Sequence, residues 1–133
     1  MQAVAVIGAT GAVGTEIIQL LSDRAFPLRS LRCFASSRSI GQSILFRGEK
    51  ISVETLSAHS LQQIDLAFFA AGSSVSQEWI PEAVKAGVLC IDSSSAFRMQ
   101  APLVIPEINP HAIKAHQGVI ASPNCAATIL LLP

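Results

Sequence analysis

The chain has 133 residues, of which half are hydrophobic and only 14% are charged, and its nine basic residues balance nine acidic ones. This length suits a single domain with one core. The balanced charge gives no support for nucleic acid or an anionic membrane as a partner, and the absence of tyrosine argues against a base-stacking surface.

The first predicted strand is Ala3–Ile7, a continuous apolar run of the kind found in buried parallel strands. It is followed by a glycine-rich turn, Gly8–Gly14, and by an amphipathic helix that we expect to end near Arg24. Residues 31–35 form the next predicted strand, which completes a β-α-β unit.

The remaining elements continue this alternation. We expect a hairpin (44–46 with 51–53), a strand (64–70), a helix (75–86, with Gly87 as C-cap), a strand (88–91), a short turn (111–115) and a last strand (118–121). The pattern predicts an α/β fold with a Rossmann-like, doubly wound, mostly parallel sheet. Ligands bind such sheets beyond the carboxyl ends of the strands, where the polar clusters of this chain fall.

The glycine-rich turn predicts a dinucleotide site. Gly8, Gly11 and Gly14 allow a tight turn and a close approach to a pyrophosphate, and Thr10 can add a hydroxyl. The alternative is an ordinary strand-to-helix turn that tolerates glycine. The flanking strand, helix and second strand favour the dinucleotide site.

The end of the second strand indicates which dinucleotide binds. An NAD site usually has an acidic residue here, whereas this chain has Arg38 and Ser39 and no acid nearby. Arginine and hydroxyl groups bind a 2′-phosphate, so the cofactor is predicted to be NADP. The alternative for Arg38 is a solvated loop cation.

Two further clusters follow predicted strands. Gly72 and Ser73 either pass close to the ribose or nicotinamide side of the cofactor or form a plain helix N-cap, and both interpretations stay open. Arg98 ends the run of residues 92–98 and can hold a substrate phosphate or carboxylate.

Cys125 lies between a proline-stiffened run and an apolar segment typical of a helix start. The positive end of a helix dipole favours the reactive thiolate, so Cys125 is our candidate nucleophile. The alternative is a buried, inert cysteine. Cys33 and Cys90 lie within predicted strands and are expected to be inert core residues.

The other signals concern metals and compartment. His59, His111 and His116 do not have metal-ligand spacing, and we predict no metal site. Three widely spaced cysteines fit a reducing compartment. Without a basic leader or a membrane-spanning apolar stretch, the sequence predicts a soluble, cytoplasmic protein with no membrane partner.

Five blocks occur in an order that resembles aspartate-semialdehyde dehydrogenases: residues 8–14, 37–41, 92–98, 106–109 and 122–125. The resemblance covers essentially the whole chain. It implies reduction of L-aspartyl-4-phosphate, a small acyl phosphate, by NADPH to aspartate semialdehyde and phosphate, a step toward lysine, threonine and methionine.

The resemblance also implies roles by position. Thr10, Gly11, Ala12 and Val13 would contact the pyrophosphate, and Arg38 with Ser39 the 2′-phosphate. Arg98 and Asn124 would hold the phosphoryl group of the substrate. Cys125 would attack the acyl carbon and form a thioester that accepts hydride.

Family members are longer than this chain, and a second domain follows the cysteine helix in them. That domain supplies the catalytic histidine and most of the homodimer interface. We therefore expect residues 1–133 to be an NADP-binding domain that lacks the substrate and dimerisation domain and is inactive alone. The alternatives are an N-acetyl-glutamyl-phosphate reductase and a non-catalytic NADP-binding module.

Overall fold

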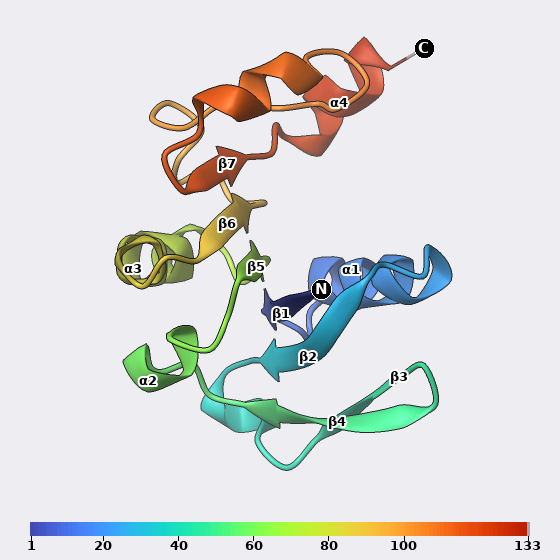
Figure 1. Cartoon of the computed structure of the whole chain (residues 1–133). Coiled ribbons are helices and arrows are strands. Elements are labelled where there is room, and N and C mark those ends of the chain that lie inside the picture. Colours follow the sequence, from blue (N-terminus) through green and yellow to red (C-terminus); the bar gives the residue numbers. More distant parts are fainter. Residues whose placement is uncertain (133) are drawn as a thin grey trace.

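The computed structural model describes residues 1–132 and contains seven strands. They are β1 (Gln2–Ile7), β2 (Leu28–Phe34), β3 (Ser43–Phe46), β4 (Glu49–Glu54), β5 (Leu66–Phe69), β6 (Leu89–Asp92) and β7 (Val119–Ala121). They form one sheet in the order β3-β4-β2-β1-β5-β6-β7 (Figure 1). The β3–β4 pair is antiparallel, and every other pairing between named strands in residues 1–132 is parallel.

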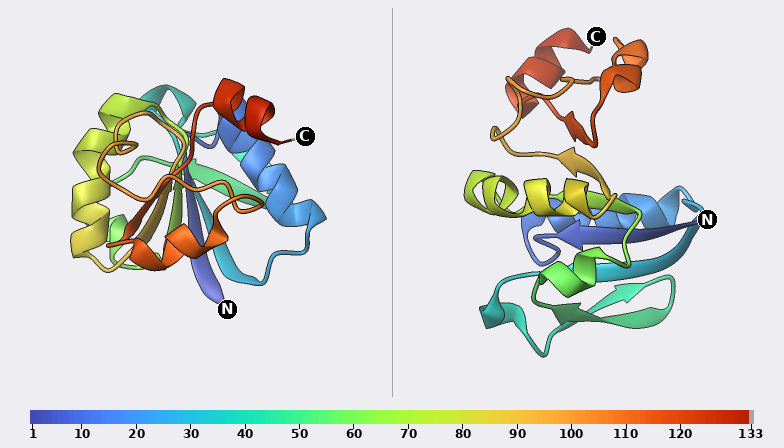
Figure 2. Two further views of the ribbon diagram at one scale, coloured as in Figure 1. Left: turned by 90° about the horizontal axis from the view of Figure 1, so that it is seen from above. Right: turned by 60° about the vertical axis from the view of Figure 1, so that its left-hand side comes forward.

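Helices lie on both faces of this sheet. They are α1 (Ala12–Asp23), α2 (Ala58–Leu61), α3 (Ser73–Lys85) and α4 (Cys125–Leu131), with 3₁₀ turns at Ser37–Ser39 and Pro110–Ala115. Helix α1 covers one face, and α2 and α3 cover the other (Figure 2). The predicted Rossmann-like, doubly wound fold is confirmed. Within residues 1–132, no helix has both the length and the apolar character needed to span a bilayer.

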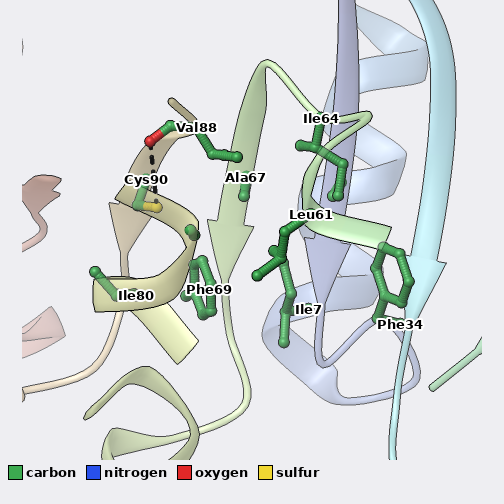
Figure 3. Close-up of a cluster of buried hydrophobic side chains, with 11 residues drawn as sticks. Ile7, Phe34, Leu61, Ile64, Ala67, Phe69, Ile80, Val88 and Cys90 are labelled. Carbon is green, nitrogen blue, oxygen red and sulfur yellow. Dashed lines mark hydrogen bonds between the residues drawn. The ribbon is translucent and has the colours of Figure 1, made fainter. Parts of the chain in front are cut away.

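Strand β1 is the centre of two cores because side chains alternate across a strand. Ala5 and Ile7 pack on the α3 side, in a cluster that includes Phe69 and Ile80 (Figure 3). Val4 and Val6 pack on the α1 side. Residues 3–7 of β1 are almost fully buried, which explains why this strand is a continuous apolar run rather than an alternating one.

The predicted hairpin is confirmed, but its second strand has a further role. Strand β4 pairs in parallel with β2, with Cys33 opposite Val53 and Phe34 opposite Glu54. Its carboxyl end therefore reaches the same sheet edge as the ends of β1 and β2. The sequence did not predict this pairing or the four-residue helix α2, because both depend on contacts between distant parts of the chain.

The buried face of α1 differs from the face that the apolar spacing suggests. Gly14, Ile18 and Leu21 are buried, whereas 52% of Val13 and 41% of Leu20 are exposed. The stripe of α1 that faces the sheet therefore runs through Gly14, Ile18 and Leu21, and Val13 and Leu20 lie beside it.

Candidate functional site

The candidate site lies along the carboxyl edge of the sheet. The chain segments that leave β2, β1, β5, β6 and β7 all emerge there, and they carry the residues that the sequence singled out. Neighbouring strands lie about 4.8 Å apart, so the four steps from β2 to β7 span about 19 Å. An extended dinucleotide and a small substrate can be accommodated side by side along such an edge.

The glycine-rich turn lies tightly against this edge. Gly8 has a φ of 88°, and a Cβ on it would lie 2.5 Å from the carbonyl oxygen of Ala70. A Cβ on Gly14 would lie 2.1 Å from the carbonyl oxygen of Gly8. Both positions therefore require glycine for the fold itself.

Gly11 differs from the other two glycines. It is exposed, and the nearest atom to an added Cβ is the carbonyl oxygen of Gly8, at 3.4 Å. Gly11 is also the N-cap of α1, where no side chain caps the first turn. The first N–H groups of a helix have no partner within the helix, so those of Ala12 and Val13 can bind an anion here.

The two predicted phosphate sites meet at the end of β2. The hydroxyl oxygens of Thr10 and Ser39 lie 3.3 Å apart. Arg38 is exposed in the 3₁₀ turn that also contains Ser39. No carboxylate occurs in residues 35–41, so nothing in this segment opposes an additional phosphate.

A cavity of about 500 Å³ opens beside the glycine-rich turn. Gly8, Thr10 and Gly11, which the sequence predicted to contact the cofactor, line it. The sequence did not predict the lining residues that come from β2, from the end of β4 and from α3: Phe34, Thr55, Leu56, Val75 and Trp79. The missing signal was the parallel pairing of β4 with β2, which brings Thr55 and Leu56 to this edge.

Gly72 and Ser73 occupy the start of α3. The N-cap is Gly72, with a φ of 93°, and no side chain caps the helix. The structure therefore has a helix N-cap here, made by Gly72 and not by a serine side chain, and the contact of Gly72 and Ser73 with the cofactor stays a prediction. The hydroxyl of Ser73 instead lies 2.9 Å from that of Ser95, which links the start of α3 to the loop after β6.

Arg98 joins the loop after β6 to the segment after β7. Its Nε donates a hydrogen bond to the carbonyl oxygen of Ser122 (2.9 Å), and its Nη2 donates to that of Ser93 (3.4 Å). The side chain is half-buried. Ser122 precedes Cys125 by three residues, which span at most about 10 Å, so the guanidinium is bound to the segment that leads to the cysteine.

Cys125 is exposed as the first residue of α4, and the alternative of a buried cysteine is wrong. Asn124 is the N-cap, and its Oδ1 accepts a hydrogen bond from the Ala127 N–H (2.7 Å). Cys33 and Cys90 are buried as predicted. Burial, with a smaller contribution from a nearby carboxylate, raises the pKa of Cys33 to about 11 and that of Cys90 to about 12.

The site therefore has two parts. The cavity lies at the ends of β2, β1 and β5, whereas Arg98 and Cys125 follow β6 and β7 and do not line it. In the part of the chain that the structure describes, no three side chains of the types His, Cys, Asp and Glu are grouped so that they could hold a metal ion.

Comparison with known proteins agrees with this geometry. Residues 3–116 match the family "Semialdehyde dehydrogenase, NAD binding domain". The chain is 50% identical over 130 residues to the aspartate-semialdehyde dehydrogenase of Synechocystis (96% of this chain, 38% of the relative). It is 46% identical over 125 residues to that of Bacillus subtilis (92% of this chain, 36% of the relative).

Among solved structures, aspartate semialdehyde dehydrogenase II of Vibrio cholerae in complex with ASA superposes with a TM-score of 0.93 at 39% identity. The match covers 98% of this chain and 44% of that one. The chain thus spans 36–44% of the length of these relatives. The resemblance noted from the motifs is confirmed. The chain belongs to the family of semialdehyde dehydrogenase NAD-binding domains, and its similar relatives are aspartate-semialdehyde dehydrogenases.

Proposed function

We propose that this chain is the cofactor-binding domain of an NADPH-dependent aspartate-semialdehyde dehydrogenase. The enzyme would convert L-aspartyl-4-phosphate into L-aspartate 4-semialdehyde and phosphate in the cytoplasm, as a homodimer with a second domain. One observation carries the proposal: a glycine-rich turn lies on the same sheet edge as an exposed cysteine and an arginine that hydrogen-bonds the segment leading to it. The names of the relatives supply the substrate.

The residues of the first part of the site fit NADP. Residues 10–13 of the turn and of the start of α1 are exposed, and the uncapped start of α1 suits the pyrophosphate. Arg38 and Ser39 would hold the 2′-phosphate by charge-assisted hydrogen bonds. The cavity lined by Trp79 would take the adenosine part.

In the second part, Cys125 would act as the nucleophile. Its thiolate attacks the acyl carbon, so that a C–S bond forms, the C–O bond to phosphate breaks, and phosphate leaves with the bonding electrons. Arg98 and the side-chain amide of Asn124 hold the departing phosphate. NADPH, when bound, would supply the hydride that reduces the thioester carbon to the aldehyde. Breaking of the C–S bond would return Cys125 as a thiolate. We place the acid/base group that serves Cys125 in the second domain.

The cofactor assignment is tested by comparing Arg38→Ala with Arg29→Ala. Both changes remove one exposed cation near β2, but Arg29 lies at the amino end of the strand, away from the site. A hydrogen bond to a charged group contributes about 1.5–3 kcal/mol, so Arg38→Ala should weaken NADPH binding by roughly 10- to 150-fold and leave NADH binding unchanged. Arg29→Ala should retain the preference for NADPH. Equal affinities of the unmodified protein for the two cofactors in calorimetry would contradict the assignment.

The reaction is tested in the whole protein that carries this chain. With NADP and phosphate, aspartate semialdehyde should be oxidised faster than N-acetyl-glutamate semialdehyde, as followed by the absorbance of NADPH. Cys125→Ser should abolish turnover while NADPH binding is retained. Faster turnover of the longer semialdehyde would instead identify an N-acetyl-glutamyl-phosphate reductase.

A further inference from the structure

Asp92 is a buried carboxylate with no role in the reaction described above. It is the last residue of β6 and has 0% of its surface exposed. Burying a carboxylate is costly unless its oxygens accept hydrogen bonds. Asp92 meets this need with three donors: Ser76 Oγ (2.8 Å) and the Ser94 N–H (3.0 Å) to Oδ1, and Ser94 Oγ (2.9 Å) to Oδ2.

These donors come from two different parts of the molecule. Ser76 is a fully buried residue of α3 on the core side of the helix. Ser94 belongs to the loop after β6 and contributes both its N–H and its hydroxyl. The carboxylate therefore fastens the start of that loop to the end of β6 and to a rigid helix.

Further hydrogen bonds connect the anchored start of the loop to Arg98. Ser94 Oγ, which donates to Asp92, also accepts the Ala96 N–H (3.1 Å), so the loop is folded back by two successive side-chain contacts. Arg98 follows two residues later and donates to the carbonyl oxygens of Ser122 and Ser93. The main-chain carbonyl of Asp92 accepts the Ser122 N–H (2.9 Å). One residue thus contacts both the loop that bears Arg98 and the segment that leads to Cys125.

We propose that Asp92 is a positioning residue: through Ser94, it fixes the loop so that the Arg98 guanidinium lies beside the segment leading to Cys125. The proposal rests on the proposed function of Arg98 as the group that holds the substrate phosphate. In this arrangement the Asp92–Ser76 contact holds the carboxylate in place, whereas the Asp92–Ser94 contact fixes the position of the Arg98 side chain.

This division yields a matched pair of variants. Ser76→Ala and Ser94→Ala each remove one hydroxyl donor to the same carboxylate, but only Ser94→Ala loosens the loop that carries Arg98. Ser94→Thr keeps the hydroxyl and should behave like the unmodified protein. Thermal melting of each variant would confirm that it is folded.

The readout is the rate at which Cys125 is alkylated by anionic iodoacetate, divided by the rate with neutral iodoacetamide, at low ionic strength. A cation within about 10 Å of the thiol favours the anionic reagent, so Arg98→Ala should lower the ratio by roughly 2- to 4-fold. Ser94→Ala should lower the ratio in the same direction, and Ser76→Ala and Ser94→Thr should leave it unchanged. In the whole protein, Ser94→Ala should raise the KM for phosphate more than it lowers kcat.

The experiment distinguishes a failure of the substrate-binding role of Arg98 from a failure of the positioning role of Asp92. An unchanged ratio in Arg98→Ala would remove the arginine from the substrate site and overturn both. A lowered ratio in Arg98→Ala with no change in Ser94→Ala would overturn the role of Asp92 alone. Equal losses in Ser76→Ala and Ser94→Ala, or a loss in Ser94→Thr equal to that in Ser94→Ala, would reduce Asp92 to general structural support and also overturn the inference.

Discussion

The glycine-rich turn offers a sharp test, because its glycines serve different purposes. In Gly14→Ala the new Cβ would lie 2.1 Å from the carbonyl oxygen of Gly8 and 2.8 Å from its carbonyl carbon. These are backbone atoms that cannot rotate away, so the helix must shift by about 1 Å. Overpacking of this kind costs about 3 kcal/mol. Because alanine gains about 1 kcal/mol over glycine within a helix, the net loss should be about 2 kcal/mol.

Such a loss should lower the melting temperature by about 8 °C for a chain of this size. Gly11→Ala is the matched control, because its Cβ meets the Gly8 oxygen at an acceptable 3.4 Å and its φ is −80°. This variant should melt within about 2 °C of the unmodified protein. It should nevertheless bind NADPH at least 10-fold more weakly, since its methyl group occupies the space that the pyrophosphate needs.

Calorimetry measures both quantities, as the melting transition and as the titration with NADPH. The interpretation would be refuted if Gly14→Ala had the same melting temperature as the unmodified protein, or if Gly11→Ala lost as much stability as Gly14→Ala. Unchanged NADPH binding by a folded Gly11→Ala variant would show that the turn does not contact the pyrophosphate of the cofactor.

Three further predictions concern thiols and fluorescence. Because burial raises the pKa values of Cys33 and Cys90 from 9.0 to about 11 and about 12, the unfolded chain loses these protons first as the pH rises. The stability that each buried thiol contributes is therefore complete well below pH 9, and on the order of 1 kcal/mol per thiol should be lost by pH 10. In urea unfolding of Cys90→Val, the free energy of unfolding should fall less between pH 8 and pH 10, because the contribution of the Cys90 thiol is absent. A brief iodoacetamide pulse at pH 7 should label Cys125 roughly 100-fold or more faster than either buried thiol, as read by mass spectrometry; comparable labelling would contradict the assigned burial. NADPH should quench the emission of Trp79, the single tryptophan, and unchanged emission at saturation would place the cofactor outside the cavity.

Local sequence was sufficient to predict the parts of this fold that depend on neighbouring residues. The apolar run of β1, the glycine-rich turn and the helix start at Cys125 each carry their signal within a few residues. The end of α3 is another example. Gly87 follows the C-cap residue Ala86 with a φ of 83°, and the Val88 N–H bonds to the Ala83 carbonyl as in a Schellman motif.

Features that depend on contacts between distant residues could not be predicted. Trp79 shows the helical spacing of a core residue, and only the fold reveals that it also lines the cavity. Asp92 follows an apolar strand and is ordinary in sequence. Its complete burial depends on Ser76, sixteen positions away on another element. The sequence pattern identifies a strand end as a site, but it does not show which polar side chain at that end is buried.

The segment that leads to Cys125 is held in place by main-chain hydrogen bonds at Ala121, the last residue of β7. The Ala121 N–H donates to the carbonyl oxygen of Pro102, and the Ala121 carbonyl accepts the Val104 N–H (2.9 and 3.0 Å). Contacts of this type persist when side chains are exchanged, and proline can serve at position 102 because only its carbonyl is used. Over evolutionary time, the exposed Leu103 can therefore be replaced while the cysteine keeps its place, whereas an insertion in this segment would displace it.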